Sequence, residues 1–271
     1  LPISAVDYSE GVKTAYPQGV QAKEFILPKE LLEQDCVISL SKMKTHALER
    51  ITGAVKNSYG FVYGFHKAKG HTQYPSADSF ARMLIDLNKC VAPKLYVMDG
   101  IVAMEGNGPG SGDPVPMNVL LMSTDPVALD SVFSRLVYLK PEMVPTNYHG
   151  EKMGLGTWKE EEITLLTPDG EISMAEAVKK YGNPAFNVDR TEVRKNIWTR
   201  MAGALNIFQK KPYIEADKCV RCGICVQSCP VPGKAVDFRK GKGKPPVYDY
   251  RKCIRCFCCQ EMCPKKAIKV K

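Results

Sequence analysis

Cysteines gather at the carboxyl-terminal end of this chain. Nine of the eleven lie in the last 53 residues, and eight of these nine repeat one pattern. Each copy reads C-x2-C-x2-C-x3-C-P, and the second copy follows the first at a spacing of 34 residues. The two copies are Cys219, Cys222, Cys225 and Cys229, then Cys253, Cys256, Cys259 and Cys263. This is an internal duplication, and a secreted disulfide scaffold would spread its cysteines differently.

The spacing within each copy is typical of iron–sulfur ligation. Three thiolates two residues apart allow a short loop to wrap one side of an iron–sulfur cube, and the fourth cysteine points to the other cube. We therefore expect two [4Fe-4S] clusters. The first would be held by Cys219, Cys222, Cys225 and Cys263, and the second by Cys253, Cys256, Cys259 and Cys229. Structural zinc is the alternative, but two triple-cysteine runs that each end in Cys-Pro favour iron–sulfur clusters.

Residues 212–271 resemble a bacterial 2[4Fe-4S] ferredoxin at all eight cysteine positions and at Pro230 and Pro264. The stretch departs from the compact pattern in a basic connection, RKGKGK at 239–244, which predicts a hairpin loop. One cysteine, Cys258, falls outside the pattern, and its counterpart in the first copy is Ile224. We expect Cys258 to pack as a small hydrophobe and not to bind iron.

Positive charge is concentrated on the same stretch. From Lys210 onward there are 16 Lys and Arg against 5 Asp and Glu, a net charge of +11, while the preceding residues carry −2. Part of this charge offsets the negative clusters, and the rest predicts a docking face for an acidic electron-transfer partner of the ferredoxin or flavodoxin kind. We expect no nucleic-acid partner, because the basic residues are not interleaved with aromatic ones.

A second group of residues suited to chemistry follows short apolar runs in the first half of the chain. The candidate catalytic residues are His46, Lys44, Lys42, Lys56, Asp99 and Glu105. Two cations, an imidazole and facing carboxylates in one crevice suit a small anionic substrate and proton transfer. The alternative is a solvated lysine pair beside a satisfied surface histidine. His66 and His71, on a stretch rich in glycine and lysine, are expected on a mobile loop.

The apolar runs themselves are typical of buried parallel strands. They are DCVISL at 35–40, KLYVMDG at 94–100 and NVLLMSTD at 118–125. Apolar periodicity predicts helices over 78–91 and 126–138, and a short strand at 162–168 precedes a helix near 173–181. Strand alternating with helix predicts an α/β domain with a mostly parallel sheet, in which ligands bind beyond the carboxyl ends of the strands.

The glycine-rich run GNGPGSG at 106–112 follows the second of these strands. A dinucleotide-binding fingerprint would continue into a helix, but here Asp113-Pro114 follows. We therefore expect a loop that allows close approach of another segment.

Three separated stretches resemble the domain-of-unknown-function family 362. They are CVISLSKMKTHALERITGAVKNSYG, YVMDGIVAMEGNGPGSG and STDPVALDSV, within roughly residues 25 to 140. Members of that family often carry a ferredoxin module at the carboxyl end. The resemblance implies an iron–sulfur protein and its architecture, without assigning a reaction.

The expected organisation is an α/β domain over 1–184, a connecting segment over 185–211 and a small α+β ferredoxin-like domain over 212–271. Because the chain opens on Leu1 and not on methionine, the first domain is expected to have room for upstream elements. No window reaches the about 18 uninterrupted apolar residues of a membrane span, so we expect a cytoplasmic protein.

The leading hypothesis is an iron–sulfur oxidoreductase, of the kind found in an anaerobe, that feeds electrons to a small anionic substrate in the α/β crevice. A first alternative is a non-catalytic electron-carrying subunit of a larger redox complex. A second is a proton-transfer enzyme whose clusters are structural. A ligand bound in the crevice would favour an enzyme, and a crevice buried against a partner would favour the subunit.

Overall fold

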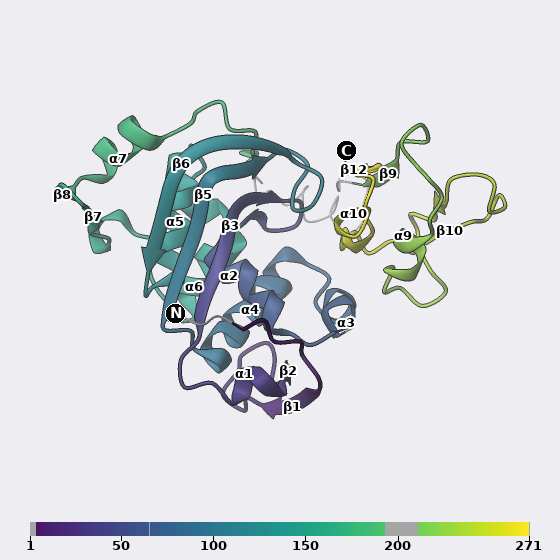
Figure 1. Cartoon of the computed structure of the whole chain (residues 1–271), viewed down its shortest axis with the longest axis horizontal. Helices are drawn as coiled ribbons and strands as arrows, with labels where there is room; N and C mark the ends of the chain where they lie inside the picture. Colours follow the sequence, from purple (N-terminus) through teal and green to yellow (C-terminus); the bar gives the residue numbers. More distant parts are fainter. Residues whose placement is uncertain (1–3, 65, 193–210, 271) are drawn as a thin grey trace, which may run out of the picture.

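A four-stranded sheet forms the centre of the larger domain (residues 4–192). The structure is a computed structural model that describes residues 4–64, 66–192 and 211–270. The strand order is β4-β3-β5-β6. Figure 1 shows β3, β5 and β6 side by side. The strands are β3 (Ile38–His46), β4 (Arg50–Thr52), β5 (Leu95–Glu105) and β6 (Asp113–Ser123).

This sheet is mixed, and the expectation of a mostly parallel sheet is wrong. Among the four strands only β3 and β5 are parallel, while β4 pairs antiparallel with β3 and β6 pairs antiparallel with β5. The reason is that the glycine-rich segment 106–112 joins β5 to β6 as a hairpin connection. Consequently Ser123, at the end of β6, lies opposite Tyr96 at the start of β5 and far along the strand from Glu105.

Two strands are longer than their apolar runs. Gly100, expected as a strand end, lies inside β5, and a side chain there would meet Val119 of β6 at 2.8 Å. Glycine at this position therefore serves close packing within the sheet. Likewise β3 continues through Lys42 and Lys44 to His46, so these residues lie within a strand and do not follow its end.

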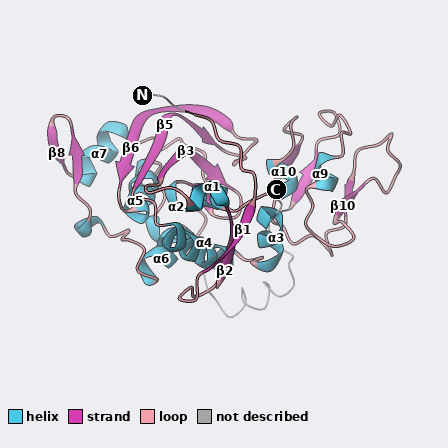
Figure 2. Cartoon of the chain, turned by 60° about the horizontal axis from the view of Figure 1, so that its bottom comes forward, coloured by secondary structure: helices cyan, strands magenta, loops and turns pink. Residues whose placement is uncertain are grey.

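Helices cover one face of the sheet (Figure 2). They are α2 (Ala54–Asn57), α4 (Ala77–Val91), α5 (Pro126–Leu136) and α6 (Pro145–Lys152). The helices predicted over 78–91 and 126–138 are confirmed as α4 and α5. At the start of α5 the side chain of Asp125 accepts the backbone N–H of Val127 and of Ala128, as an N-cap does. Between sheet and helices, Met98 and Phe133 are fully buried in a shared apolar core.

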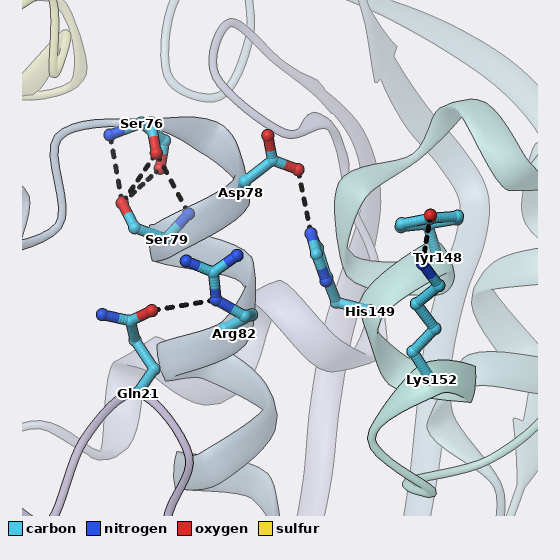
Figure 3. Close-up of polar contacts among 8 residues, drawn as sticks. All are labelled: Gln21, Ser76, Asp78, Ser79, Arg82, Tyr148, His149 and Lys152. Carbon is cyan, nitrogen blue, oxygen red and sulfur yellow. Dashed lines mark hydrogen bonds and ion pairs between the residues drawn. The ribbon is translucent and has the colours of Figure 1, made fainter.

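The start of α4 is fixed by polar contacts (Figure 3). Ser76 and Ser79 form a reciprocal capping box at its N-terminus. Nε2 of His149, on α6, lies 2.8 Å from a carboxylate oxygen of Asp78 on α4. These contacts hold α4 against α6 and so fix the layer of helices beneath the sheet.

The opposite face of the sheet carries exposed apolar side chains. Leu40 on β3 and Met122 on β6 are 72% and 62% exposed, and both lie beside Val97 on the intervening strand β5. Ile38 and Leu120 are also exposed on these two strands.

The remaining elements of the larger domain are short. They are β1 (Gly11–Ala15), β2 (Glu24–Pro28), α1 (Lys29–Leu32), η1 (Ser58–Phe61), α3 (His66–Gln73), η2 (Pro141–Met143), η3 (Glu160–Glu162), β7 (Leu165–Thr167), β8 (Gly170–Ile172) and α7 (Met174–Tyr181). The helix predicted near 173–181 is confirmed as α7. The strand predicted at 162–168 is β7, which pairs with β8 outside the main sheet.

The C-terminal module (residues 211–270) repeats its own backbone. Its elements are β9 (Pro212–Ile214), α9 (Ile224–Gln227), β10 (Val236–Asp237), β11 (Val247–Tyr248), α10 (Cys258–Glu261) and β12 (Ile268–Val270). Strand β9 pairs with β12, and β10 pairs with β11. Equivalent residues of the two copies share positive φ angles, for example Arg221 at 59° and Arg255 at 57°. The duplication read from the cysteines therefore extends to the chain path.

The segment expected to connect the two domains is only partly described. Residues 185–192 pack on the larger domain, where Phe186 is fully buried against Phe133. Residues 193–210 lie outside the described residues. The domain boundaries drawn from the sequence therefore stay a prediction.

The two domains meet at the β5–β6 hairpin. Gln260 of α10 donates from Nε2 to the carbonyls of Asn107 (2.9 Å) and Gly108 (3.1 Å). The side-chain amide of Asn107 in turn donates to the carbonyl of Ile268 at 3.2 Å. A side chain at Gly110 would meet the carbonyl oxygen of Glu261 at 3.0 Å. The glycine-rich loop thus allows close approach, as expected, and what approaches is helix α10.

Candidate functional site

Two cavities of the C-terminal module are lined by cysteines. Cavity A is lined by Cys219, Cys222, Cys225 and Cys263, and cavity B by Cys229, Cys253, Cys256 and Cys259. Each cavity therefore combines three cysteines of one copy with the last cysteine of the other copy. This is the grouping expected from the sequence for two ligand sets.

The donor set of each cavity fits a cluster. Four thiols surround each space, as a cube with an iron at every ligated corner requires. Within the described residues, no three Cys, His, Asp or Glu are arranged to hold a single metal ion. A cube places its thiolate ligands at separate corners, so its ligands enclose a volume and do not converge on one point.

The sulfur atoms also have hydrogen-bond donors. The backbone N–H of Ala235 points to Sγ of Cys229 at 3.4 Å, and that of Ala267 points to Sγ of Cys263 at 3.3 Å. These two donors occupy equivalent places in the two copies. Donation to sulfur stabilises negative charge there, which suits thiolate ligands.

The thiols of cavity A are close enough to disfavour one another's ionisation. Burial, and after it the charges of Cys219, Cys222 and Cys263, raise the pKa of Cys225 to about 11. Four thiolates would therefore persist in this cavity only with cations among them. Iron ions meet that requirement.

A cleft of about 890 Å³ lies between the two domains. On one side the cleft is lined by residues of the larger domain, from β3, β4, α2, η1 and α3 and the segments beside them. On the other side it is lined by residues of the C-terminal module, from α9 and α10 and the segments that follow them. Cys229 and Pro230 line both the cleft and cavity B. The cleft therefore borders the second cysteine set directly.

Lys44 and Lys56, two of the predicted catalytic residues, line this cleft. Lys44 comes from β3, and Lys56 from α2. Burial, and then the charge of Lys56, lower the pKa of Lys44. The two ammonium groups therefore repel each other across a partly desolvated space.

His46 lies behind the cleft wall and is 4% exposed. Its Nδ1 accepts the backbone N–H groups of Leu48 and Glu49, each at 3.1 Å. Nδ1 is therefore unprotonated, and the proton of the neutral ring sits on Nε2. That nitrogen lies 3.3 Å from Oε1 of Glu261, on α10.

The protonation of this pair is set by burial and by Lys56. Burial, and then the charge of Lys56, lower the pKa of His46 to about 4. Burial acts to raise the pKa of Glu261, but Lys56 and the neighbouring His46 outweigh it and hold that pKa at about 2. At neutral pH a neutral imidazole therefore faces a carboxylate across the domain boundary.

Three predicted residues do not reach the cleft. Lys42 and Asp99 pair with each other across β3 and β5, on the exposed face of the sheet with side chains 45% and 41% exposed. Glu105 accepts the backbone N–H of Asn187 at 2.7 Å and so fastens the segment near 187 to the end of β5. The three strand ends do not meet in one crevice, because β6 runs antiparallel to β5.

Other residues of the cleft were not singled out from the sequence. Glu261 is one, and its equivalent in the first copy is Gln227, so the duplication alone gives no hint of a carboxylate there. His71, expected on a mobile loop, lies on α3, where its buried ring stacks on Phe80 with centroids 4.4 Å apart. Cys258 is buried, as expected for a small hydrophobe, and it lines the cleft.

Comparison with protein families adds an independent result. Residues 1–135 match the model described as Domain of unknown function (DUF362), and residues 211–264 match a 4Fe-4S dicluster domain. The chain carries both domains. The dicluster domain supports an iron–sulfur electron-transfer role and the binding of 4Fe-4S clusters.

One curated protein to which the chain is similar is a thylakoid-associated protein of Synechocystis sp.. It is 42% identical over 130 residues, which cover 48% of this chain and 40% of the relative. The match therefore spans less than half the length of that relative. No solved structure matches the chain. Among the described residues no helix is long and apolar enough to cross a membrane.

Proposed function

We propose that this protein is an oxidoreductase that uses two [4Fe-4S] clusters to reduce a small anionic substrate in the interdomain cleft. Cysteines of cavities A and B would hold the clusters in the two sets given above. The observation that carries the proposal is the shared wall of cavity B and the cleft, formed by Cys229 and Pro230. A substrate in the cleft would lie next to a redox centre.

When bound, the clusters supply single electrons at low potential. The chain's own residues do the rest. Lys44 and Lys56 would attract and orient the anion, and the lowered pKa of Lys44 makes its ammonium a stronger acid than that of an ordinary lysine. Lys44 is thus suited to give a proton to a substrate that gains electrons. His46, with its acceptor nitrogen in use, would orient the carboxylate of Glu261.

Anaerobic iron and acid-labile sulfide analysis tests the cofactor part of this proposal. We expect about eight irons and eight sulfides per chain, four for each cube. One zinc per cysteine motif with little sulfide would contradict it.

The ligand sets are tested by a matched pair of substitutions. Cys256→Ala should lose one cluster, about half of the iron, because cavity B would keep three of its cysteines. Cys258→Ala should retain both clusters. Equal iron loss in the two variants would refute the assignment of Cys256 as a ligand and Cys258 as a packing residue.

We also propose an acidic electron-transfer protein, of the ferredoxin or flavodoxin kind, as the partner of the C-terminal module. Lys240, Lys242 and Lys244 support this proposal. All three are exposed on the loop between β10 and β11 and lie outside both cysteine cavities.

A second candidate is an electron-carrying subunit of a larger redox complex. The exposed apolar side chains on the outer face of the sheet, Leu40 and Met122 among them, favour it, because such faces are often covered by a partner. Size-exclusion chromatography of the protein with its native complement of partners distinguishes the two. Reduction of an added organic anion by the isolated chain would support the oxidoreductase and not the subunit.

A further inference from the structure

The interdomain cleft has two chemically different walls. Its volume of about 890 Å³ lies within the range of small-molecule sites. Lys44, Lys56, Lys67 and Lys69 line the side of the larger domain. On the side of the C-terminal module the apolar side chains of Ile224, Pro230 and Met262 line the cleft, together with two cysteines and with Gln227, Ser228, Lys234 and Glu261. A ligand that fills the cleft therefore meets cations at one side and apolar groups at the other.

The lysines of the cleft lack partners of opposite charge. Five lysines and one glutamate line the cleft, a net charge of +4. Among the ion pairs of residues 4–64, 66–192 and 211–270, none involves these five lysines. The one carboxylate, Glu261, faces His46. Glu261 lies within electrostatic reach of Lys44 and Lys56 and offsets one positive charge, so a net charge of +4 remains in the cleft.

Lys56 occupies the centre of this charge. Its ammonium contributes to lowering the pKa of Lys44 and of Lys67, in each case after burial. Lys44 and Lys67 therefore lie within electrostatic reach of the same neighbour. An anion placed between them would relieve two repulsions together.

A buried polar atom at the cleft also lacks a partner. His71 lines the cleft and is 4% exposed, and its Nδ1 has no hydrogen-bond partner among the described residues. Buried polar atoms are normally satisfied, so an unpaired one at the wall of a cavity indicates a ligand or water that would pair with it.

We propose that the cleft binds an organic anion with at least two negative groups, which pair with Lys44, Lys56 and Lys67 while its apolar body packs against Ile224, Pro230 and Met262. This inference rests on the proposed function for the idea that the cleft holds a substrate, and it adds the class of that substrate. A monoanion would leave most of the positive charge unpaired. An inorganic anion would leave the apolar wall without contacts.

Calorimetric titration of the anaerobically prepared holoprotein tests the proposal. The probes are benzoate, isophthalate and trimesate, which share one aromatic ring and carry one, two and three carboxylates. Isophthalate should bind at least about tenfold more tightly than benzoate, because one added charge-assisted contact contributes about 1.5 kcal/mol or more. Equal affinity for the three probes would overturn the proposal.

The variants are matched by charge. Lys56→Gln and Lys67→Gln should each remove most of the gain in affinity that the second carboxylate of isophthalate gives over benzoate. Lys56→Arg should keep this gain in affinity. Lys94→Gln removes the same charge at an exposed position outside the cleft and should leave the gain unchanged. Lys67 is itself exposed on α3, so its variant stays informative if the one at Lys56 does not fold.

The outcome is separate from that of the proposed function. Visible absorption and iron content report on the clusters in every variant, independently of the probes. Two intact clusters with no binding of isophthalate or trimesate would refute the substrate class alone. Loss of the gain in Lys94→Gln to the same extent as in Lys56→Gln would refute the cleft as the binding site.

Discussion

At the scale of single residues, hydrogen-bond partners decide what a side chain can do. His46 looked suited to proton transfer, but two backbone N–H groups occupy its Nδ1. The ring can therefore donate from Nε2 but cannot accept a proton without losing these bonds. Its place opposite Glu261 suits it to orient that carboxylate, and Lys44 is the acid in the proposed reaction.

Tyr248 carries a prediction about redox potential. Its hydroxyl donates to Sγ of Cys259, a proposed ligand in cavity B, at 3.1 Å. Tyr248→Phe should lower the reduction potential of that cluster by about 40 mV, because a hydrogen bond worth about 1 kcal/mol favours the more negative, reduced form. Redox titration followed by electron paramagnetic resonance measures the shift.

Tyr250 offers the matched control for this prediction. Its ring stacks on Tyr248 with centroids 5.6 Å apart, but its hydroxyl donates to the carbonyl of Pro212 and not to sulfur. Tyr250→Phe should leave both potentials in place. Equal shifts in the two variants would mean that ring packing, and not the bond to sulfur, sets the potential.

Asp130 carries a prediction about stability. Its buried carboxylate accepts the backbone N–H groups of Ala54 at 2.5 Å and Val55 at 3.1 Å, at the start of α2. An asparagine has one acceptor oxygen, so Asp130→Asn leaves one of these donors unpaired. We expect a loss of about 1–3 kcal/mol in the free energy of unfolding, measured by urea denaturation of the larger domain.

The same residue makes stability depend on pH. Burial raises the pKa of Asp130 from its ordinary 3.8 to about 7. Between these two pH values the native state holds a proton that the unfolded chain has released. The stabilisation that the raised pKa gives to the native state is therefore complete below about pH 4 and is lost as the pH rises toward 7. The melting temperature should fall over this window in the parent and fall less in Asp130→Asn. Parallel curves for the two proteins would contradict the raised pKa.

At the scale of elements, sequence patterns were sufficient to predict the features that depend on neighbouring residues alone. The cysteine grouping and helices α4, α5 and α7 depend on spacing, capping and periodicity, all of which are visible in the chain. The direction of β6 follows from the length of β5. Because β5 continues through Gly100 to Glu105, only residues 106–112 remain to connect it to β6, and they do so as a hairpin. Gly100 is paired with Val119 of β6, and no local pattern contains this pairing between strands.

The candidate site shows the same limit. Lys44 and Lys56 were predicted because they follow the apolar run at 35–40, and the structure places them on β3 and α2. Glu261 was missed because it reaches His46 only through the docking of α10, more than two hundred residues further along the chain. Lys42 and Asp99, also expected in the crevice, pair with each other on the outer face of the sheet. The register of β3 against β5 shifts between Lys42 and Lys44, which separates Lys42 from the cleft.

The contact between α10 and the hairpin 106–112 gives a prediction at this scale. Gln260 is fully buried and supplies both hydrogen bonds to the hairpin carbonyls. Gln260→Met keeps the shape of the side chain but leaves these carbonyls unpaired, at a cost of about 1–3 kcal/mol. Amide exchange of residues 106–112 should become faster, while exchange in α5 of the same sample stays unchanged. Equal protection of the hairpin in both proteins would show that other contacts hold the two domains together.

At the scale of the whole molecule, charge is divided between the two domains. Lys240, Lys242 and Lys244 extend from the C-terminal module on an exposed loop. Replacing all three with glutamine should slow reduction of the clusters by an acidic ferredoxin-like or flavodoxin-like donor about tenfold at low salt. The difference should shrink near physiological salt, where the Debye length is about 8 Å. Stopped-flow absorption measures the second-order rate.

A control with the same charge change lies on the larger domain. Lys94, Lys179 and Lys180 are exposed there, and their replacement with glutamine removes three charges far from the loop. This variant should accept electrons as the parent does. If the loop variant is as fast as the parent at low salt, the basic loop only balances cluster charge and the partner docks elsewhere.

The two cysteine cavities differ in how they meet the solvent. In cavity A Cys222 is exposed and Gly223 follows it, whereas in cavity B the equivalent of that glycine is Phe257, a buried aromatic ring. Dioxygen dissolved in the medium would therefore reach one cube long before the other. In air the protein should bleach in two phases and pause at a species with half its iron, whose remaining cube is the one beside the cleft.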